Sequence, residues 1–476
     1  MWNWRERWRR PGGSREVLAF SYLLILSQMT FTLQTFIDRV LLTWYAPEAM
    51  AAATASVFLT QVGILVCAGT GQYTTTFVAQ FVGAGRRERV GAVMWQGIWF
   101  ALASGLLLAA LAPGAGAIFE AAGHAPVLRA DETTFARILL LGAFPIVLMP
   151  TLASFFSGRG ATRVVLLVSV VAALANVLLD YLWIFGRLGF PEGGVAGAAL
   201  ATVVSDVLGA GLFFGLMLRR RFRVEFATLA CRLEPRLLVR LLRFGLPAGS
   251  HFPFELLAVA LFTLIVGRLG TEELAATGIA FSLNGLVFMP MVGLGLGVMA
   301  LVGRYHGSGR SDLAERVFGW SLVYMVLCAL AYVLLPHLLL GPYAAGADPR
   351  TFAPVAATAV VLLRFIAVYS IFDMMNAIFA AALRGAGDTT FPLAVAVVAS
   401  WTVMIVPTYV ACVELDGGLI AAWSFASLAF VIIGLAMLVR YRAGRWRELR
   451  VIEPSVATPE LVRRGASGGR DASSCT

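Results

Sequence analysis

Residues 382–390 read ALRGAGDTT and come directly after an apolar run, VVLLRFIAVYSIFDMMNAIFAA, at residues 360–381. A looser copy, FFSGRGATR at residues 155–163, follows another apolar run about 227 residues earlier. In both copies a pair of glycines and an arginine stand where a long hydrophobic segment stops. Because glycine allows the chain to turn tightly, the two copies indicate that a helical unit and the hinge that follows it are duplicated in the chain.

The chain is far too apolar for a soluble globular protein. Of its 476 residues, 59% are hydrophobic and only 13% are charged, whereas soluble domains carry about 25% charged residues. A transmembrane helix needs about 20 mostly apolar residues. We expect about twelve such segments, at residues 17–45, 50–80, 91–115, 133–157, 162–186, 193–218, 241–267, 275–304, 315–340, 354–383, 389–413 and 417–440. The sequence therefore predicts an all-α membrane protein with twelve transmembrane helices.

The repeat extends well beyond the hinge. MAAATASVF at 50–58 lies over LAATGIAFS at 274–282, an offset of about 224, and at that offset Gly83 falls on Gly307. Each half then holds six spans, and because six is even, both halves enter the membrane from the same side. We expect a basic N-terminus, an N-lobe, a cytoplasmic linker, a C-lobe and a partly disordered cytoplasmic tail, at residues 1–16, 17–218, 219–240, 241–440 and 441–476 respectively.

We interpret the formal charge of +10 as a sign of how the chain is oriented in the membrane, and not as a sign of a nucleic-acid partner. Arginines cluster at alternate segment ends, for example at 5–15, 219–243 and 440–447, while the intervening loops, such as APEAM and ELDGG, carry few bases. This pattern satisfies the positive-inside rule and predicts that both termini are cytoplasmic.

Five acidic residues fall inside the predicted spans: Asp38, Asp180, Asp206, Glu255 and Asp373. Each costs at least about 2.5–3.5 kcal/mol on insertion scales, so each needs a compensating partner. Asn176 lies one helical turn before Asp180, and Ala198, Thr202 and Asp206 repeat at the same spacing. Carboxylate, amide and hydroxyl oxygens are hard ligands that suit a sodium ion or a proton better than a transition metal.

In the second half, Glu255 follows two prolines, Pro247 and Pro253, which free backbone carbonyls near the acid. Asp373 has Tyr369 one turn earlier. The alternative for all five acids is an interhelical hydrogen bond or ion pair, with Arg39 and Arg364 as available partners. We interpret His251 as a hydrogen-bonded polar residue rather than a ligand.

Three stretches together resemble the multidrug and toxic compound extrusion (MATE) family of the MOP superfamily, in its bacterial, NorM-like members. They are the hinge ALRGAGDTT, NVLLDYLWIFGRLGFPEGGVAGAALAT at 176–202 and GLPAGSHFPFE at 245–255, and the resemblance covers about residues 15–442. It implies two pseudo-symmetric six-helix bundles around a V-shaped cleft, and export of organic cations driven by entry of Na⁺ or H⁺.

The resemblance also implies the site residues. In the N-lobe the family's coupling-ion site is matched by Asp38, Asn176, Asp180, Ala198 and Thr202, with Na⁺ at Asp38, Asn176, Asp180 and Thr202. In the C-lobe its acids are matched by Glu255 and Asp373, with Tyr369 beside them. Because this chain has both sets, the resemblance leaves open which lobe binds the coupling ion. Asp206 departs from the family pattern, in which a neutral amide is commoner.

We therefore predict a multi-pass antiporter of the bacterial inner membrane that takes cationic small molecules, works as a monomer in the lipid bilayer and needs no cofactor besides Na⁺ or H⁺. A flippase of the same superfamily for a lipid-linked oligosaccharide is the alternative. A membrane-embedded enzyme is disfavoured, because the four histidines are dispersed. In the hinge we expect Asp388 and Thr389 to cap the next helix.

Overall fold

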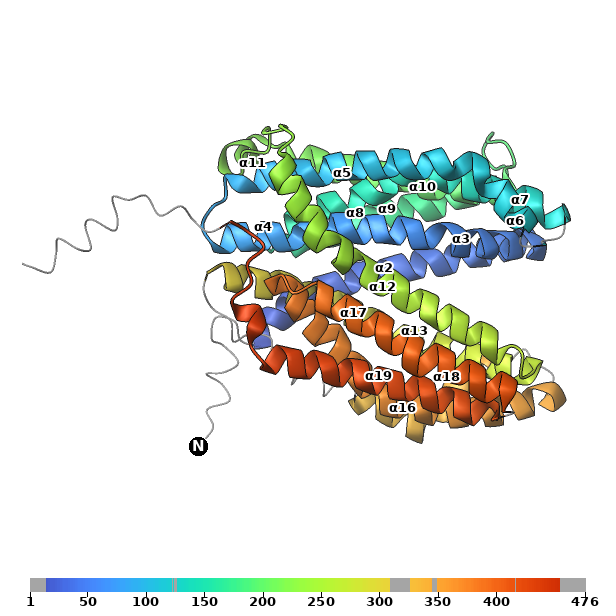
Figure 1. The fold of residues 1–476 in the computed structure, drawn as a ribbon. Helices are drawn as coiled ribbons and strands as arrows, with labels where there is room; N and C mark the ends of the chain where they lie inside the picture. Colours follow the sequence, from blue (N-terminus) through green and yellow to red (C-terminus); the bar gives the residue numbers. More distant parts are fainter. Residues whose placement is uncertain are drawn as a thin grey trace, which may run out of the picture.

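In a computed structural model of the chain, residues 14–121, 123, 126–308, 326–344, 349–415 and 417–453 are described (Figure 1). We call the helices of the first half the N-lobe: α2 (Ser14–Tyr45), α3 (Pro47–Gln72), α4 (Thr74–Gly83), α5 (Arg89–Leu111), α6 (Ala115–Ala121), α7 (Pro126–Leu141), α8 (Ala143–Gly158), α9 (Thr162–Ile184) and α10 (Gly194–Met217). Short α11 (Arg220–Glu225) leads to the C-lobe: α12 (Pro235–Val266), α13 (Thr271–Gly307), α15 (Pro336–Ala344), α16 (Pro349–Ala386), α17 (Thr390–Ala399), α18 (Val406–Tyr409) and α19 (Gly418–Arg442). Every regular element of the described ranges is helical.

Nine helices in the described part are long and apolar enough to cross a membrane. Two bent pairs add to them: α7 with α8, which meet at 47°, and residues 326–334 with α15, which meet at 67°. The remaining expected span, 50–80, is formed by α3 and α4, which join at Tyr73. The fold is therefore the predicted twelve-helix arrangement. One expected span, 315–340, lies partly outside the described residues.

The two hinges are built alike, as their glycines predict. Gly160 and Gly387 both have positive φ, +88° and +110°, a conformation that favours glycine. The preceding glycines both pack on backbone: a Cβ at Gly158 would lie 2.8 Å from the carbonyl oxygen of Thr75, and one at Gly385 would lie 2.6 Å from that of Met299. Thr75 and Met299 are separated by the same offset of about 224 residues. The duplication thus extends from the sequence to individual packing contacts.

One part of the hinge prediction is wrong. Thr389 occupies the N-cap position of α17 but makes no side-chain capping bond, and Asp388 does not cap the helix either. Its Oδ2 accepts a hydrogen bond of 2.7 Å from Nε of Arg440 on α19. The carboxylate is buried, so a nearby guanidinium compensates its charge better than a helix N-terminus would. Asp388 therefore fastens the hinge to α19.

The two lobes meet through reciprocal glycine contacts. Gly83 of α4 packs on the carbonyl oxygen of Arg304 in α13, and Gly307 of α13 packs on the carbonyl oxygen of Gln80 in α4. At the repeat offset, Gly83 corresponds to Gly307 and Gln80 to Arg304. The contact is therefore made twice, once in each direction, as a two-fold axis between the halves requires.

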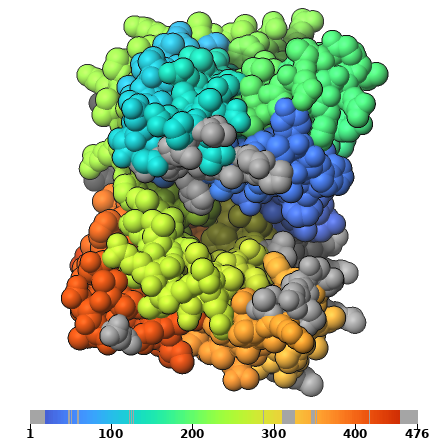
Figure 2. Space-filling model, turned by 90° about the vertical axis from the view of Figure 1, so that its right-hand side faces the viewer, coloured from blue at the N-terminus to red at the C-terminus, as the bar shows by residue number. Residues whose placement is uncertain are grey.

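The lobes are packed together at one end only. A hydrophobic core that includes Phe77, Phe81, Val298, Met299 and Leu383 crosses between them near the arginine-rich loops, whereas two further cores lie within single lobes. Figure 1 shows the lobes separating from this end, which carries α4, α11 and the end of α19, toward the end that carries α6 and α7. Seen from that second end, the surface is hollowed between the lobes (Figure 2). We call the joined end the arginine-rich end.

Candidate functional site

The first acidic cluster joins α2 to α9 inside the N-lobe. Asn176 and Asp180 are fully buried, and Asp38 is partly exposed. With its amide nitrogen turned toward the acids, Asn176 donates to Oδ1 of Asp38 at 2.9 Å and to Oδ2 of Asp180 at 3.1 Å. The structure therefore brings together three residues that are up to 142 positions apart in the chain.

The geometry places two carboxyl groups close together. Because both oxygens contact the same Asn176 nitrogen, they lie within about 6 Å of each other, and two unit charges at that distance repel by about 3 kcal/mol at an effective dielectric constant of about 20. Oδ1 of Asp180 is buried without any hydrogen-bond partner. Such a pair favours occupancy by one monovalent cation or one proton.

The other predicted N-lobe residues stand beside this cluster on α10. Ala198 is buried, and the hydroxyl of Thr202 donates to the carbonyl oxygen of Ala198 at 3.1 Å, so its proton is used within its own helix. Asp206 lies one turn further and is partly exposed. Gln34, which the sequence analysis missed, brings its side-chain amide to 3.1 Å from that of Asn176. Its spacing of four residues from Asp38 was the available signal.

The second cluster joins α12 to α16 inside the C-lobe. Oε1 of Glu255 accepts a hydrogen bond of 3.2 Å from Nδ2 of Asn376 on α16. Oδ1 of Asp373 is buried without a partner. Asn376, also missed from the sequence, thus bonds to Glu255 from the helix that carries Asp373. Its position three residues after Asp373 places it on the same helix face.

His251 and Tyr369 border the C-lobe cluster. Nδ1 of His251 lies 3.9 Å from Oε2 of Glu255, but its buried Nε2 has no partner, so the expectation of a fully hydrogen-bonded histidine is wrong. Tyr369 stacks on Phe430 with ring centroids 4.7 Å apart, and its buried hydroxyl is also without a partner. The site therefore holds several buried polar atoms that have no protein partner.

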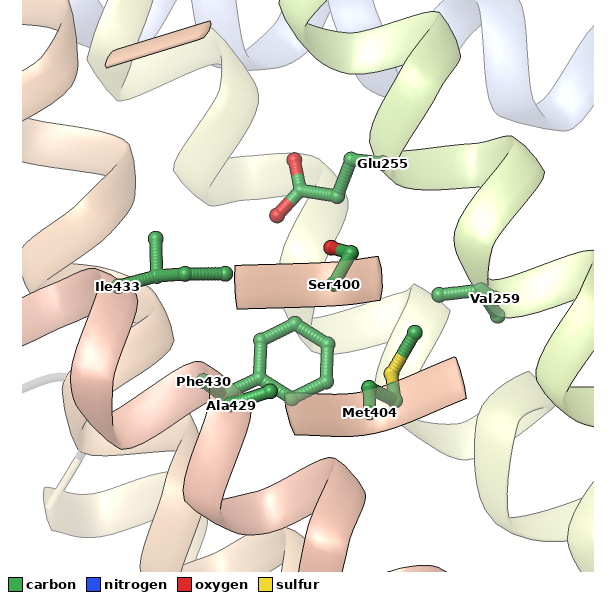
Figure 3. A pocket seen from close by; sticks show the side chains of 7 residues that line it. All are labelled: Glu255, Val259, Ser400, Met404, Ala429, Phe430 and Ile433. Carbon is green, nitrogen blue, oxygen red and sulfur yellow. The ribbon is translucent and has the colours of Figure 1, made fainter. Parts of the chain in front are cut away.

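A small cavity adjoins Glu255. It is lined by Glu255, Val259, Ser400, Met404, Ala429, Phe430 and Ile433, and Figure 3 shows the carboxylate on one side with the Phe430 ring and Met404 on the other. The cavity has room for about one water molecule. Ser400 begins η2 (Ser400–Ile405), a π-helical turn, and such turns are frequent at functional sites. In this conformation the cavity suits a single water molecule, and a drug-sized molecule does not fit.

Arginine does not pair directly with these acids, although the partly buried Arg384 guanidinium on α16 attracts the Glu255 carboxylate from beyond ion-pair distance. Arg39 and Arg364, the partners that the alternative requires, are both exposed, and within the described ranges no arginine forms an ion pair with Asp38, Asp180, Glu255 or Asp373. The same ranges contain no group of three or more His, Cys, Asp and Glu side chains suited to a metal ion. Each cluster therefore combines two acids with an asparagine, which bonds to both Asp38 and Asp180 in the N-lobe and to Glu255 in the C-lobe.

The MatE family matches residues 24–182 and 247–410 of the chain. Similar proteins include probable multidrug resistance proteins NorM from three bacteria. The one from Thermotoga maritima is 27% identical over 86% of this chain and 87% of its own length. The one from Mesorhizobium japonicum is 28% identical over 91% and 94%, and the one from Rhizobium meliloti is 30% identical over 80% and 81%.

Solved structures share the fold. An outward-facing conformation of a multidrug resistance MATE family transporter matches with a TM-score of 0.80 at 20% identity, over 91% of this chain and 96% of that one. A MOP superfamily transporter from Pyrococcus furiosus, for which the reverse polarity of the binding pocket suggests a different function, matches with the same TM-score at 19% identity over the same shares. These likenesses establish the fold and leave the chemistry to the residues described above.

Proposed function

Because this chain belongs to the MATE family of membrane transporters, we propose that it is a secondary active antiporter that exports cationic, amphipathic drugs in exchange for Na⁺ or H⁺. The observation that carries the proposal is that each lobe holds a pair of acids with a buried, unpartnered carboxylate oxygen, on Asp180 and on Asp373. In the described structure neither pair of acids forms an ion pair with arginine. A transient monovalent cation supplies the missing charge.

We assign the arginine-rich end to the cytoplasm of the bacterial inner membrane, because positive loops stay inside. The structure is then closed toward the cytoplasm and parted toward the outside, the state in which a coupling ion enters and a drug leaves. Ion binding at the acids would favour the opposite, inward-facing state. A drug bound from the cytoplasm would then displace the ion as the cycle returns.

The drug itself would bind between the lobes. The cavity beside Glu255 is too small for it, whereas the hollow between the lobes opens at the far end (Figure 2). Both acid clusters lie within single lobes, so their charge can change with ion binding while the hollow changes with lobe movement. The ion and the drug can therefore compete through the movement of the lobes, even though they do not bind to the same residues.

The test is export of a cationic dye from cells that lack their own pumps, with and without a Na⁺ gradient and with and without a proton gradient. The wild type should export the dye under one of the two gradients. Asp38→Asn, Glu255→Gln and Asp373→Asn should each be compared with it at matched expression. No export under either gradient would refute the antiporter, and normal export by all three variants would refute the site.

A further inference from the structure

The segment that follows α19 is also packed against the protein. After η4 (Arg445–Arg447), residues 448–453 run as an irregular segment across the arginine-rich end, and we call them the strap. The strap is held at its base by Trp446, which is fully buried, stacks on Tyr441 at 5.0 Å and donates its indole N–H to the Tyr441 carbonyl at 2.8 Å. Val451 is fully buried as well. The strap is therefore a packed part of the protein.

The strap is covalently attached to the C-lobe and also makes three hydrogen-bonding contacts with it. Nε2 of His306 on α13 lies 2.6 Å from the Leu449 carbonyl oxygen. Arg240 on α12 donates through Nη2 to the carbonyl oxygens of Arg450 and Ile452, both at 3.2 Å. These bonds fix the strap to α12 and α13, so it moves with the C-lobe.

The far end of the strap crosses to the N-lobe. Oε1 of Gln80 on α4 accepts hydrogen bonds from the backbone N–H groups of Val451 at 3.1 Å and Ile452 at 3.4 Å. Arg86, in the loop after α4, donates through Nη1 to the Glu453 carbonyl oxygen at 2.8 Å. The strap therefore bridges the two lobes at the end where they are closed.

Gln80 ties the strap to the hinge. Its side chain is fully buried, and its Nε2 donates to the carbonyl oxygen of Gly385 at 3.0 Å while its Oε1 holds the strap. Beside it, the hydroxyl of Tyr73 donates to the carbonyl oxygen of Arg384 at 2.8 Å. If the lobes part here, Gln80 loses its hinge and strap bonds together, because all its partners belong to the C-lobe. This arrangement makes closure cooperative.

We propose that the strap is a latch, carried by the C-lobe, which holds the arginine-rich end closed and must release Gln80 and Arg86 before that end opens. The proposal rests on the alternating-access function above, because a latch has a role only if the end opens. The strap makes three hydrogen bonds with each lobe. Its covalent link to α19 keeps it with the C-lobe, so opening of this end breaks the three bonds to Gln80 and Arg86.

The test measures opening directly, without transport. Spin labels at Arg163→Cys on α9 and Arg442→Cys on α19, both exposed positions on opposite lobes, report the distance across the arginine-rich end. They are placed in a full-length background in which the native cysteines are replaced. Two variants remove the latch: Gln80→Ala, and a stop codon after Arg447. Double electron–electron resonance spectroscopy of the labelled protein in nanodiscs then gives the ratio of open to closed molecules.

Gln96→Ala is the matched control. Gln96 is another fully buried glutamine, with bonds to the carbonyl oxygens of Ala92 and Arg232 and from the N–H of Glu234, none of them in the strap. We expect both latch variants to raise the ratio of open to closed molecules by roughly tenfold or more over this control, because a lost hydrogen bond alone shifts an equilibrium several-fold.

The proposal is overturned if either latch variant has the same ratio as Gln96→Ala. Should Gln80→Ala fail to fold, Arg86→Ala replaces it, because this partly exposed side chain bonds the strap only through Glu453. The distances are measured without a substrate or a gradient, so a failure of the antiporter proposal would appear as missing export while the latch result stayed readable.

Discussion

Replacing Asp180 by asparagine tests the N-lobe cluster most sharply. The substitution keeps the shape of the side chain and removes one of two carboxylates whose oxygens lie within about 6 Å of each other around Asn176. A cation between the two groups therefore lies within about 6 Å of each, and loses at least about 3 kcal/mol of attraction at an effective dielectric constant of about 20. Since about 1.4 kcal/mol is tenfold in affinity, cation binding should weaken by about 100-fold.

The assay is thermal unfolding of the purified protein against Na⁺ concentration, and separately against pH. A bound ion stabilises the fold by about 2.7 kcal/mol at a concentration of 100 times its dissociation constant. The wild type should therefore unfold at a higher temperature as the coupling ion is added. The Asp180→Asn protein should need about 100-fold more of that ion for the same rise, and without the ion it should be at least as stable as the wild type, because the repulsion between the carboxylates is gone.

Asp206→Asn is the matched control, because Asp206 is an acid of the same lobe that stands on α10 and is not among the hydrogen-bond partners of Asn176. It should leave the ion dependence unchanged. The reasoning is refuted if Asp180→Asn and the wild type need the same ion concentration for equal stabilisation, or if Asp206→Asn weakens the response as much as Asp180→Asn does.

Three further substitutions test the hinge and the C-lobe. Gly385→Ala should destabilise the fold by about 1–3 kcal/mol in denaturant unfolding, since its methyl group would lie 2.6 Å from a carbonyl oxygen of α13. Gly215→Ala is the control and should leave the stability unchanged, because its methyl group meets open space. Equal effects of the two substitutions would contradict this packing. Asp388→Ala should cost about 1–3 kcal/mol because it strands a partly buried Arg440 guanidinium, and the claim fails if the double variant with Arg440→Ala is no more stable than the single one. Asn376→Leu should reduce dye export at a given ion gradient by removing the bridge at Glu255, which unaltered export would disprove.

The duplicated architecture could be predicted because it rests on local signals. Apolar segment length, arginine placement and repeated glycines are each written within a few residues, and the matched backbone contacts of Gly158 and Gly385 follow from them. The broken spans were harder to predict. Gly142 separates α7 from α8 at a bend of 47°, and a glycine within an apolar run does not by itself show whether the helix continues.

The acids could be located from the sequence, but their partners could not. Asp38 and Asp180 meet because α2 packs against α9, and nothing in the sequence indicates that these two helices are neighbours. Asn376 bonds to Glu255, which lies 121 residues away in the chain. Asp388 shows the same limit: its position before a helix indicates a cap, whereas the ion pair to Arg440 depends on where α19 lies. Local rules predict a residue's environment, and distant helices decide which of several hydrogen-bonding options it takes.

The paired contacts of Gly83 on Arg304 and Gly307 on Gln80 have an evolutionary consequence. They are the contacts that two copies of one six-helix ancestor would make as a symmetric homodimer, so fusion of the two genes would preserve an interface already in place. The acid clusters do not follow this symmetry: at the repeat offset Asp38 falls on Phe262 and Glu255 on Phe31. Once both halves were encoded in a single gene, each could acquire its own chemistry without imposing it on the other.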